Sequence, residues 1–139
     1  MKVDRLFVAT KAFIINDGKV LILKESSKYE DGSNEDKWDV VGGRVEPGQR
    51  FDESLVREIK EETGLNVKIG RPFSVGEWRP NVRGEQWQIV ATFFECFSDS
   101  SEVKLSKDHE DFKWIDPKNY EKYNIIETNK KSFKDYLEK

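Results

Sequence analysis

Short apolar segments rich in β-branched and aromatic residues constrain the fold of this chain more than any other feature. Leu6–Ile15 and Val20–Leu23 flank Asn16-Asp17-Gly18, and an Asp-Gly pair between two apolar segments is a strong hairpin signal. We expect further strands at Trp38–Val41, Val67–Trp78, Trp87–Phe97 and Phe112–Ile115. With helices between the strands, this order predicts a single α/β domain over residues 1–139, built on a mixed β-sheet.

The segment Phe51–Thr63 is the clearest helix, and Gly64 supplies its C-terminal stop. On a helical wheel Leu55, Val56 and Ile59 lie on one side, which we expect to face the core.

Two further segments complete the predicted domain. Phe133, Tyr136 and Leu137 have the i, i+3, i+4 spacing of a C-terminal helix that packs by one face. Glu25–Lys37 is long and highly charged, which is typical of a surface loop. It is either a solvated insertion or a mobile loop beside a functional site, since long loops in compact domains are often functional.

Composition excludes several classes of protein. The 139 residues include 24 Lys and Arg against 27 Asp and Glu, so the net charge of −3 gives no argument for a stable nucleic-acid partner. Hydrophobic residues make up 36% of the chain, with four Trp and nine Phe, which is too apolar for a disordered chain. No apolar stretch approaches the ~18 residues of a membrane span, and MKVDRLFVAT has no signal-peptide pattern. We expect a soluble cytoplasmic protein without a membrane partner.

The chain has one cysteine, Cys96, and one histidine, His109. An intramolecular disulfide is therefore impossible, and we expect Cys96 to be a buried free thiol. Zinc sites of the Cys₄ or Cys₂His₂ kind are excluded as well. Any metal must be held by carboxylates.

Three glutamates occupy positions that destabilise the predicted helix. Glu58, Glu61 and Glu62 share one face of the predicted helix, and the i, i+4 pair of like charges costs about 0.2–0.5 kcal/mol. Glu61 and Glu62 also lie in the last turn, where the helix dipole favours a cation by about 0.3–1 kcal/mol. Mg²⁺ or Mn²⁺ would relieve this repulsion, because carboxylates are hard oxygen ligands. The alternative for the helix alone is a solvated acidic face.

The residues around this helix favour phosphate chemistry. Gly42 and Gly43 precede it and allow the backbone to approach a ligand closely. Arg57 lies one turn from both Glu53 and Glu61, so we expect it to pair with both and to orient the acids. Carboxylates that hold a divalent cation beside a glycine turn are suited to binding phosphate oxygens and activating water.

The motif Gly43-x5-Gln49-x7-Arg57-Glu58-Ile59-x-Glu61-Glu62-x-Gly64-Leu65 spans residues 43–65. It resembles the Nudix box, Gly-x5-Glu-x7-Arg-Glu-U-x-Glu-Glu-x-Gly-U, in which U is a bulky aliphatic residue, and eight of its nine specified positions match. The resemblance implies an α/β/α sandwich and Mg²⁺-dependent hydrolysis of a nucleoside diphosphate linked to another group. The compact chain is most similar to MutT-type members, which convert a (d)NTP to (d)NMP and pyrophosphate.

The resemblance also implies roles for individual residues. Glu58, Glu61 and Glu62 would be metal ligands, with the carbonyl of Gly43 as a possible further ligand, and Arg57 would orient Glu58. In some family members the residue at the position of Glu58 is also proposed as the general base.

In other family members the base comes from a distal loop. The segment from Ser106 to Asp111 resembles that loop, and we select Glu110, with Asp108 and Asp111 as alternatives. For His109 we favour a surface or packing role over a catalytic contact.

The rest of the substrate needs cations and a flat partner. Trp78 is a candidate to stack on a base, and Arg79 and Arg83 are candidates to bind phosphate beside Gly42 and Gly43. The alternative is a surface turn with a half-buried tryptophan. Trp38 and Trp87 are expected in the core or on a sheet face.

Two residues, Pro80 and Gln49, keep other functions open. Pro80 lies 15 residues after Leu65, and a proline near this distance from the box marks ADP-ribose pyrophosphatases in the family. Gln49 replaces the first glutamate of the box and cannot act as a base or anionic ligand. A domain that senses a nucleotide without hydrolysing it is therefore a second alternative, and a homodimer is possible in either case.

Overall fold

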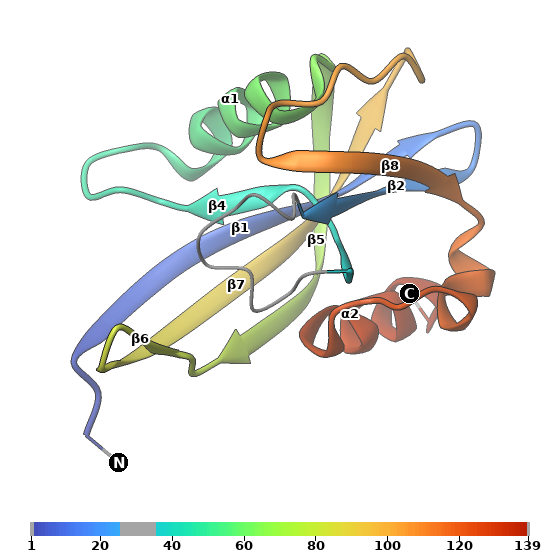
Figure 1. Ribbon diagram of the computed structural model, residues 1–139. Coiled ribbons are helices and arrows are strands. Elements are labelled where there is room, and N and C mark those ends of the chain that lie inside the picture. Colours follow the sequence, from blue (N-terminus) through green and yellow to red (C-terminus); the bar gives the residue numbers. More distant parts are fainter. Residues whose placement is uncertain (1, 26–35, 139) are drawn as a thin grey trace.

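The computed structural model describes residues 2–25 and 36–138, so most of the predicted loop Glu25–Lys37 lies outside the described residues (Figure 1). The strands are β1 (Arg5–Asn16), β2 (Lys19–Glu25), β3 (Trp38–Asp39), β4 (Gly42–Arg44), β5 (Val67–Trp78), β6 (Asn81–Val82), β7 (Glu85–Ser98) and β8 (His109–Ile115). The helices are α1 (Phe51–Thr63), the 3-10 helix η1 (Pro117–Lys122) and α2 (Glu127–Glu138).

The sheet is mixed, as the order of the segments predicts. Its main path runs β3-β2-β1-β7-β5, with β4 paired to β1, β8 to β2 and β6 to β7. The central pair β1 and β7 is parallel, and the other pairs are antiparallel. The predicted Asp-Gly hairpin joins β1 to β2, and both Asp17 (φ 51°) and Gly18 (φ 74°) take the left-handed conformation that such a turn requires.

Side-chain alternation along the strands creates two cores, one on each face of the sheet. Ala12 and Ile14 of β1 belong to the cluster that includes Leu55 and Ile59 of α1. Phe13, between them, belongs to the opposite cluster, which includes Phe133 of α2. The two helices lie on opposite sides of the sheet (Figure 1), so the fold is an α/β/α sandwich.

Helix α1 has the predicted bounds, but the prediction that Val56 faces the core is wrong. Leu55 and Ile59 are fully buried, whereas 39% of Val56 is exposed. The buried side instead includes Ser54 and Thr63, and the Thr63 hydroxyl donates to the Ile59 carbonyl oxygen at 2.6 Å. Because Ser54 lies on the same side of the helix as Glu58 and Glu62, the buried side is centred nearer to these acids than to Val56.

Of the predicted strand Trp38–Val41, only Trp38 and Asp39 form a strand, and a second short strand with a different partner begins after Val41. Trp38 and Asp39 of β3 pair with β2, whereas Gly42–Arg44 of β4 pair with β1. The chain therefore crosses from one neighbouring strand to the other directly before the Nudix-like motif. This crossing places Asp39 and Gly42 beside the same residue of β1, Lys11.

The burial of Cys96 and the lengths of the helices can also be compared with the expectations from the sequence. Cys96 is a free and fully buried thiol, as predicted, and burial raises its pKa to about 12. Among residues 2–25 and 36–138, neither helix is both long enough and apolar enough to cross a bilayer.

Candidate active site

A cleft of about 390 Å³ opens where β1, β3, β4, α1 and β8 meet. Its described lining contains five carboxylates, from Glu25, Asp39, Glu58, Glu62 and Asp108, but a single ammonium group, from Lys11. His109, Val40, Val41 and Gly42 complete the lining. This excess of negative charge repels phosphate unless a cation is also bound.

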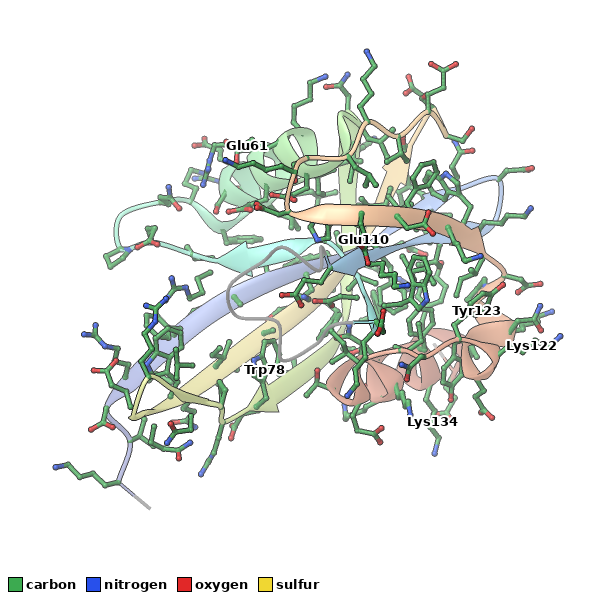
Figure 2. All side chains as sticks on the ribbon, viewed as in Figure 1. Glu61, Trp78, Glu110, Lys122, Tyr123 and Lys134 are labelled. Carbon is green, nitrogen blue, oxygen red and sulfur yellow. The ribbon has the colours of Figure 1, made fainter. Side chains whose placement is uncertain are left out.

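Helix α1 presents two of its glutamates to the cleft and one away from it. Side-chain exposure is 24% for Glu58 and 17% for Glu62, but 55% for Glu61. Figure 2 shows Glu61 at the outer surface of α1. Its carboxylate lies 3.3 Å from Arg57 Nη1, and the other terminal nitrogen of Arg57 lies 3.9 Å from Glu58 Oε1. Arg57 is thus placed between two of the predicted metal ligands.

Glu53 does not form the ion pair with Arg57 that the spacing predicts. Its carboxylate lies 3.7 Å from Arg50 Nε, because Arg50 directly precedes the helix and reaches across its first turn. Arg57 therefore acts on the acids at the C-terminal end of α1 alone.

The pKa of Glu58 is raised. Burial of the carboxyl group is the largest cause, and the charges of Glu61 and Glu62 raise it further, while Arg57 opposes the shift. Repulsion among the three glutamates, inferred from the sequence, therefore acts on the half-buried Glu58.

Gly42 and Gly43 are needed for different reasons. A Cβ atom on Gly42 would lie 2.3 Å from the Thr10 carbonyl oxygen, so a side chain there would separate β4 from β1. A Cβ atom on Gly43 would lie 3.1 Å from the Glu58 carboxylate. The first glycine allows the strands to pair, and the second leaves room for the carboxylate.

Glu62 has two neighbours from the segment that leads into β8, Ser106 and His109. The Ser106 hydroxyl donates to Glu62 Oε2 at 2.7 Å. His109 Nδ1 lies 2.8 Å from the same oxygen but makes no well-formed hydrogen bond there or elsewhere among the described residues. His109 lines the cleft. From the sequence we expected it to have a surface or packing role.

No three His, Cys, Asp or Glu side chains within the described parts of the chain are grouped closely enough to hold a metal ion. The donors nevertheless fit Mg²⁺ in kind. Glu58 and Glu62 offer hard carboxylate oxygens within one cleft, against which Gly43 packs. For Glu61 to join them, its side chain would have to leave Arg57 and turn toward the cleft.

A second cavity, of about 350 Å³, adjoins this acidic cleft. Trp78 and Trp87 line it, together with Pro80, Val82, Ile89, Ile126, Thr128 and Asn129. Lys11 and Asp39 line both spaces and so lie at their junction. We call the second space the aromatic cavity. Figure 2 shows Trp78 at the end of β5.

The other predicted site residues lie outside both linings. Arg79 Nε donates to Glu77 Oε2 at 2.8 Å, and Arg83 is an exposed residue of the turn between β6 and β7, with φ 50°.

Gln49 is exposed and accepts from the Glu46 backbone N–H at 3.2 Å, which closes the turn before α1. Glu110 is exposed on β8, whereas Asp108 and His109 face the cleft.

Sequence reasoning missed Lys11 and Asp39. Lys11 is the one charged residue within the apolar segment Leu6–Ile15, and such a residue is a signal that could have been followed. Its partner is 28 residues away along the chain. No local spacing links the two residues.

Comparisons with known proteins identify the family of this chain. The family model described as "NUDIX domain" matches residues 5–136. The nucleoside triphosphatase NudI of Escherichia coli K12 is 29% identical over 128 residues, which cover 87% of this chain and 89% of that protein.

Solved structures show the same fold. The MutT protein of Methanosarcina mazei Go1 has a TM-score of 0.81 at 23% identity, over 99% of this chain and 97% of that one. An ADP-ribose pyrophosphatase of Streptococcus suis has a TM-score of 0.65 at 19% identity, over 94% and 87%. The sequence motif, the acidic cleft and the match to the family model together show that the chain belongs to the Nudix hydrolase family, enzymes that cleave pyrophosphate bonds in nucleotides.

Proposed function

We propose that this enzyme hydrolyses a nucleoside triphosphate to a nucleoside monophosphate and pyrophosphate, with Mg²⁺ as its cofactor and Mn²⁺ as a substitute. The juxtaposition of the acidic cleft and the aromatic cavity carries the proposal. A cleft with five carboxylates and one ammonium suits metal-bound phosphates, and a cavity with two tryptophans suits a base. The two spaces share Lys11 and Asp39 in their linings and so lie side by side, as the two ends of one nucleotide require.

The metal would be held by Glu58 and Glu62, with the Gly43 carbonyl and, after a change of rotamer, Glu61. When bound, Mg²⁺ neutralises phosphate charge and lowers the pKa of bound water.

Arg57 holds Glu58 and Glu61 in place, while Ser106 does the same for Glu62. Glu58 lines the cleft and is a candidate to accept a proton from water. Asp108 is the nearest alternative base, since it lines the cleft and Glu110 does not.

The relatives favour a triphosphate substrate. NudI, which matches most of this chain, is named a nucleoside triphosphatase. ADP-ribose is the second candidate substrate, because Pro80 lines the aromatic cavity where the substrate's base would lie.

A nucleotide sensor without hydrolytic activity is the third candidate, and Gln49 is its support. Gln49 lies outside the cleft and closes a turn through an oxygen that glutamate also has. Its position therefore favours an active enzyme.

Chromatographic analysis of products tests these candidates together. The purified protein is incubated with Mg²⁺ and each of a panel of (d)NTPs, ADP-ribose and other nucleotide sugars. Release of a nucleoside monophosphate with pyrophosphate supports the proposal, and release of AMP from ADP-ribose supports the second candidate. Nucleotide binding without any product would identify a sensor. Gel filtration of the same sample would test whether the enzyme is a homodimer.

A further inference from the structure

Lys11 is an unusual residue for its place in the fold. It lies in the middle of the central strand β1, and only 9% of it is exposed. Lysine is rarely buried unless its ammonium group is paired. Gly42 opposes it on β4, and a Cβ atom on that glycine would lie 2.7 Å from Lys11 Cδ. The strand pairing therefore leaves a space that the lysine side chain fills.

Asp39 holds the ammonium group in position. Lys11 Nζ lies 2.9 Å from Asp39 Oδ1 and 3.1 Å from Oδ2. Asp39 Oδ1 also accepts from the Val40 backbone N–H at 2.7 Å and from Asn129 Nδ2 at 2.6 Å. Three hydrogen-bond donors thus orient the carboxylate, and the carboxylate in turn orients Lys11. An ammonium group has three N–H donors, so at least one remains for a ligand.

The pair lies where the two cavities meet. Lys11 and Asp39 contribute to the lining of both the acidic cleft and the aromatic cavity. Lys11 supplies the one ammonium group in the described lining of either space. Consider a nucleotide with its base in the aromatic cavity and its outer phosphates in the acidic cleft. The phosphate that is joined to its sugar would then lie at the junction, beside the Lys11 ammonium group.

We infer that Lys11 binds the phosphate joined to the sugar, and that Asp39 and Asn129 are positioning residues that hold Lys11 for this contact. The inference rests on the proposed function and assigns one atom, Lys11 Nζ, to one group of the substrate. It also explains why a half-buried ion pair occupies this junction, where two apolar side chains would pack without desolvating a charge.

Binding measurements on a neutralised pair test the inference. Lys11→Met alone would leave the Asp39 carboxylate without its cation, so the variant to use is Lys11→Met with Asp39→Asn. Asparagine keeps an oxygen that can accept from Val40 and Asn129. Lys19→Met is the matched control, because Lys19 is an exposed lysine at the start of β2. Thermal melting would verify that each variant folds.

The ligands distinguish the phosphate contact from other contacts. Dissociation constants are measured for AMP, GMP, CMP, UMP and dTMP, for the corresponding nucleosides, and for pyrophosphate with Mg²⁺. We expect the double variant to bind the monophosphate that wild type prefers about 10- to 100-fold more weakly, the effect of losing a hydrogen bond to a charged group. Binding of the nucleoside and of pyrophosphate should be unchanged, as should all binding to Lys19→Met.

Three results would overturn the inference. Unchanged monophosphate binding would show that Lys11 does not contact phosphate. An equal loss for nucleoside and monophosphate would place Lys11 on the base or sugar, and an equal loss for pyrophosphate would place it in the metal cleft. Failure of the proposed function is a separate result, since wild type would then bind nucleotides without releasing products. A wild-type protein that binds no nucleotide would overturn both.

Discussion

The inner and outer sides of helix α1 carry the same kind of residue in different surroundings. On the outer side each acid has an arginine beside it. Asp52 and Glu53 lie within 3.7 Å of Arg50, and Glu61 lies 3.3 Å from Arg57. On the inner side Glu62 has a serine hydroxyl and a histidine as neighbours, and Glu58 shares the cleft with four other carboxylates.

This difference separates acids held in exposed ion pairs from acids that line the cleft. Paired acids on an exposed helix face contribute little to stability. On the inner side, burial raises the pKa of Glu58 and the charges of Glu61 and Glu62 raise it further, against the opposing charge of Arg57, so ionised Glu58 costs stability there. Local destabilisation of this kind is expected where a ligand, here a divalent cation, completes the site.

Removing one inner carboxylate should have the largest effect. Glu62→Gln should lower Mg²⁺-dependent hydrolysis roughly 100- to 1000-fold, because the metal loses an anionic ligand worth several kcal/mol. Without metal the variant should melt at the same temperature or slightly higher, since a repulsive charge is gone. Rates with saturating Mg²⁺ and melting curves in EDTA provide the two measurements.

Glu53→Gln is the matched control for that experiment. It makes the same chemical change on the outer side of the same helix, where the side chain is exposed beside Arg50. Its hydrolysis rate should stay near that of wild type. Equal losses in the two variants would show that the two sides of α1 do not differ in function, and a large loss of stability in metal-free Glu62→Gln would contradict the charge argument.

The two glycines provide the next test. Gly43→Ala should lower the rate about 10- to 100-fold with little change in melting temperature, because its methyl group displaces the Glu58 carboxylate by a few tenths of an ångström. Gly42→Ala should instead lower the free energy of unfolding by about 1–3 kcal/mol, since its methyl group meets the Thr10 carbonyl oxygen. Parallel kinetic and melting measurements would separate the two, and a reversed pattern would refute the assignment.

A smaller effect is expected in the aromatic cavity. Trp78→Leu keeps an apolar wall but loses the flat surface for a base, so KM should rise about 10-fold. The value of kcat should change little, because Trp78 does not line the acidic cleft. Steady-state kinetics with the preferred substrate would show this split. A fall in kcat at constant KM would mean that the cavity does not bind the base.

The smallest effect should come from the departure in the motif. Gln49→Glu should change the rate less than about 3-fold, as is usual for an exposed position whose hydrogen bond is retained. Initial rates at saturating substrate are sufficient to test this. A gain of tenfold or more would show that Gln49 weakens the natural enzyme and would favour the sensor hypothesis.

Local sequence signals predicted much of the fold. The bounds of α1 and β5 agree with the predicted Phe51–Thr63 and Val67–Trp78, because Gly64 and the apolar alternation mark their ends. The hairpin at Asp17 was equally local. The orientation of α1 was not predictable in this way. Val56 is as apolar as Leu55 and Ile59, yet it is exposed while Ser54 is buried, so apolar character alone does not mark the buried side.

The site was predictable where its residues are close in sequence. The motif places Glu58 and Glu62 one turn apart on α1, and both line the cleft. Residues from other elements were less accessible to prediction. The pairing of β2 with β8 has an irregularity between Lys24 and Glu25, opposite His109, and it is His109 and not Glu110 that lines the cleft. A register irregularity of this kind has no signature in one sequence.

The central claim is that Glu58 and Glu62, the glutamates of α1 that line the cleft, bind a cation that the hydrolysis requires. The most direct test is to titrate Mg²⁺ while following nucleoside monophosphate release from a triphosphate, with wild type, Glu53→Gln and Glu62→Gln side by side. We predict saturable Mg²⁺ dependence in wild type and Glu53→Gln, and a rate in Glu62→Gln that stays low at every Mg²⁺ concentration reached. Hydrolysis in EDTA, or an unimpaired Glu62→Gln, would contradict the claim.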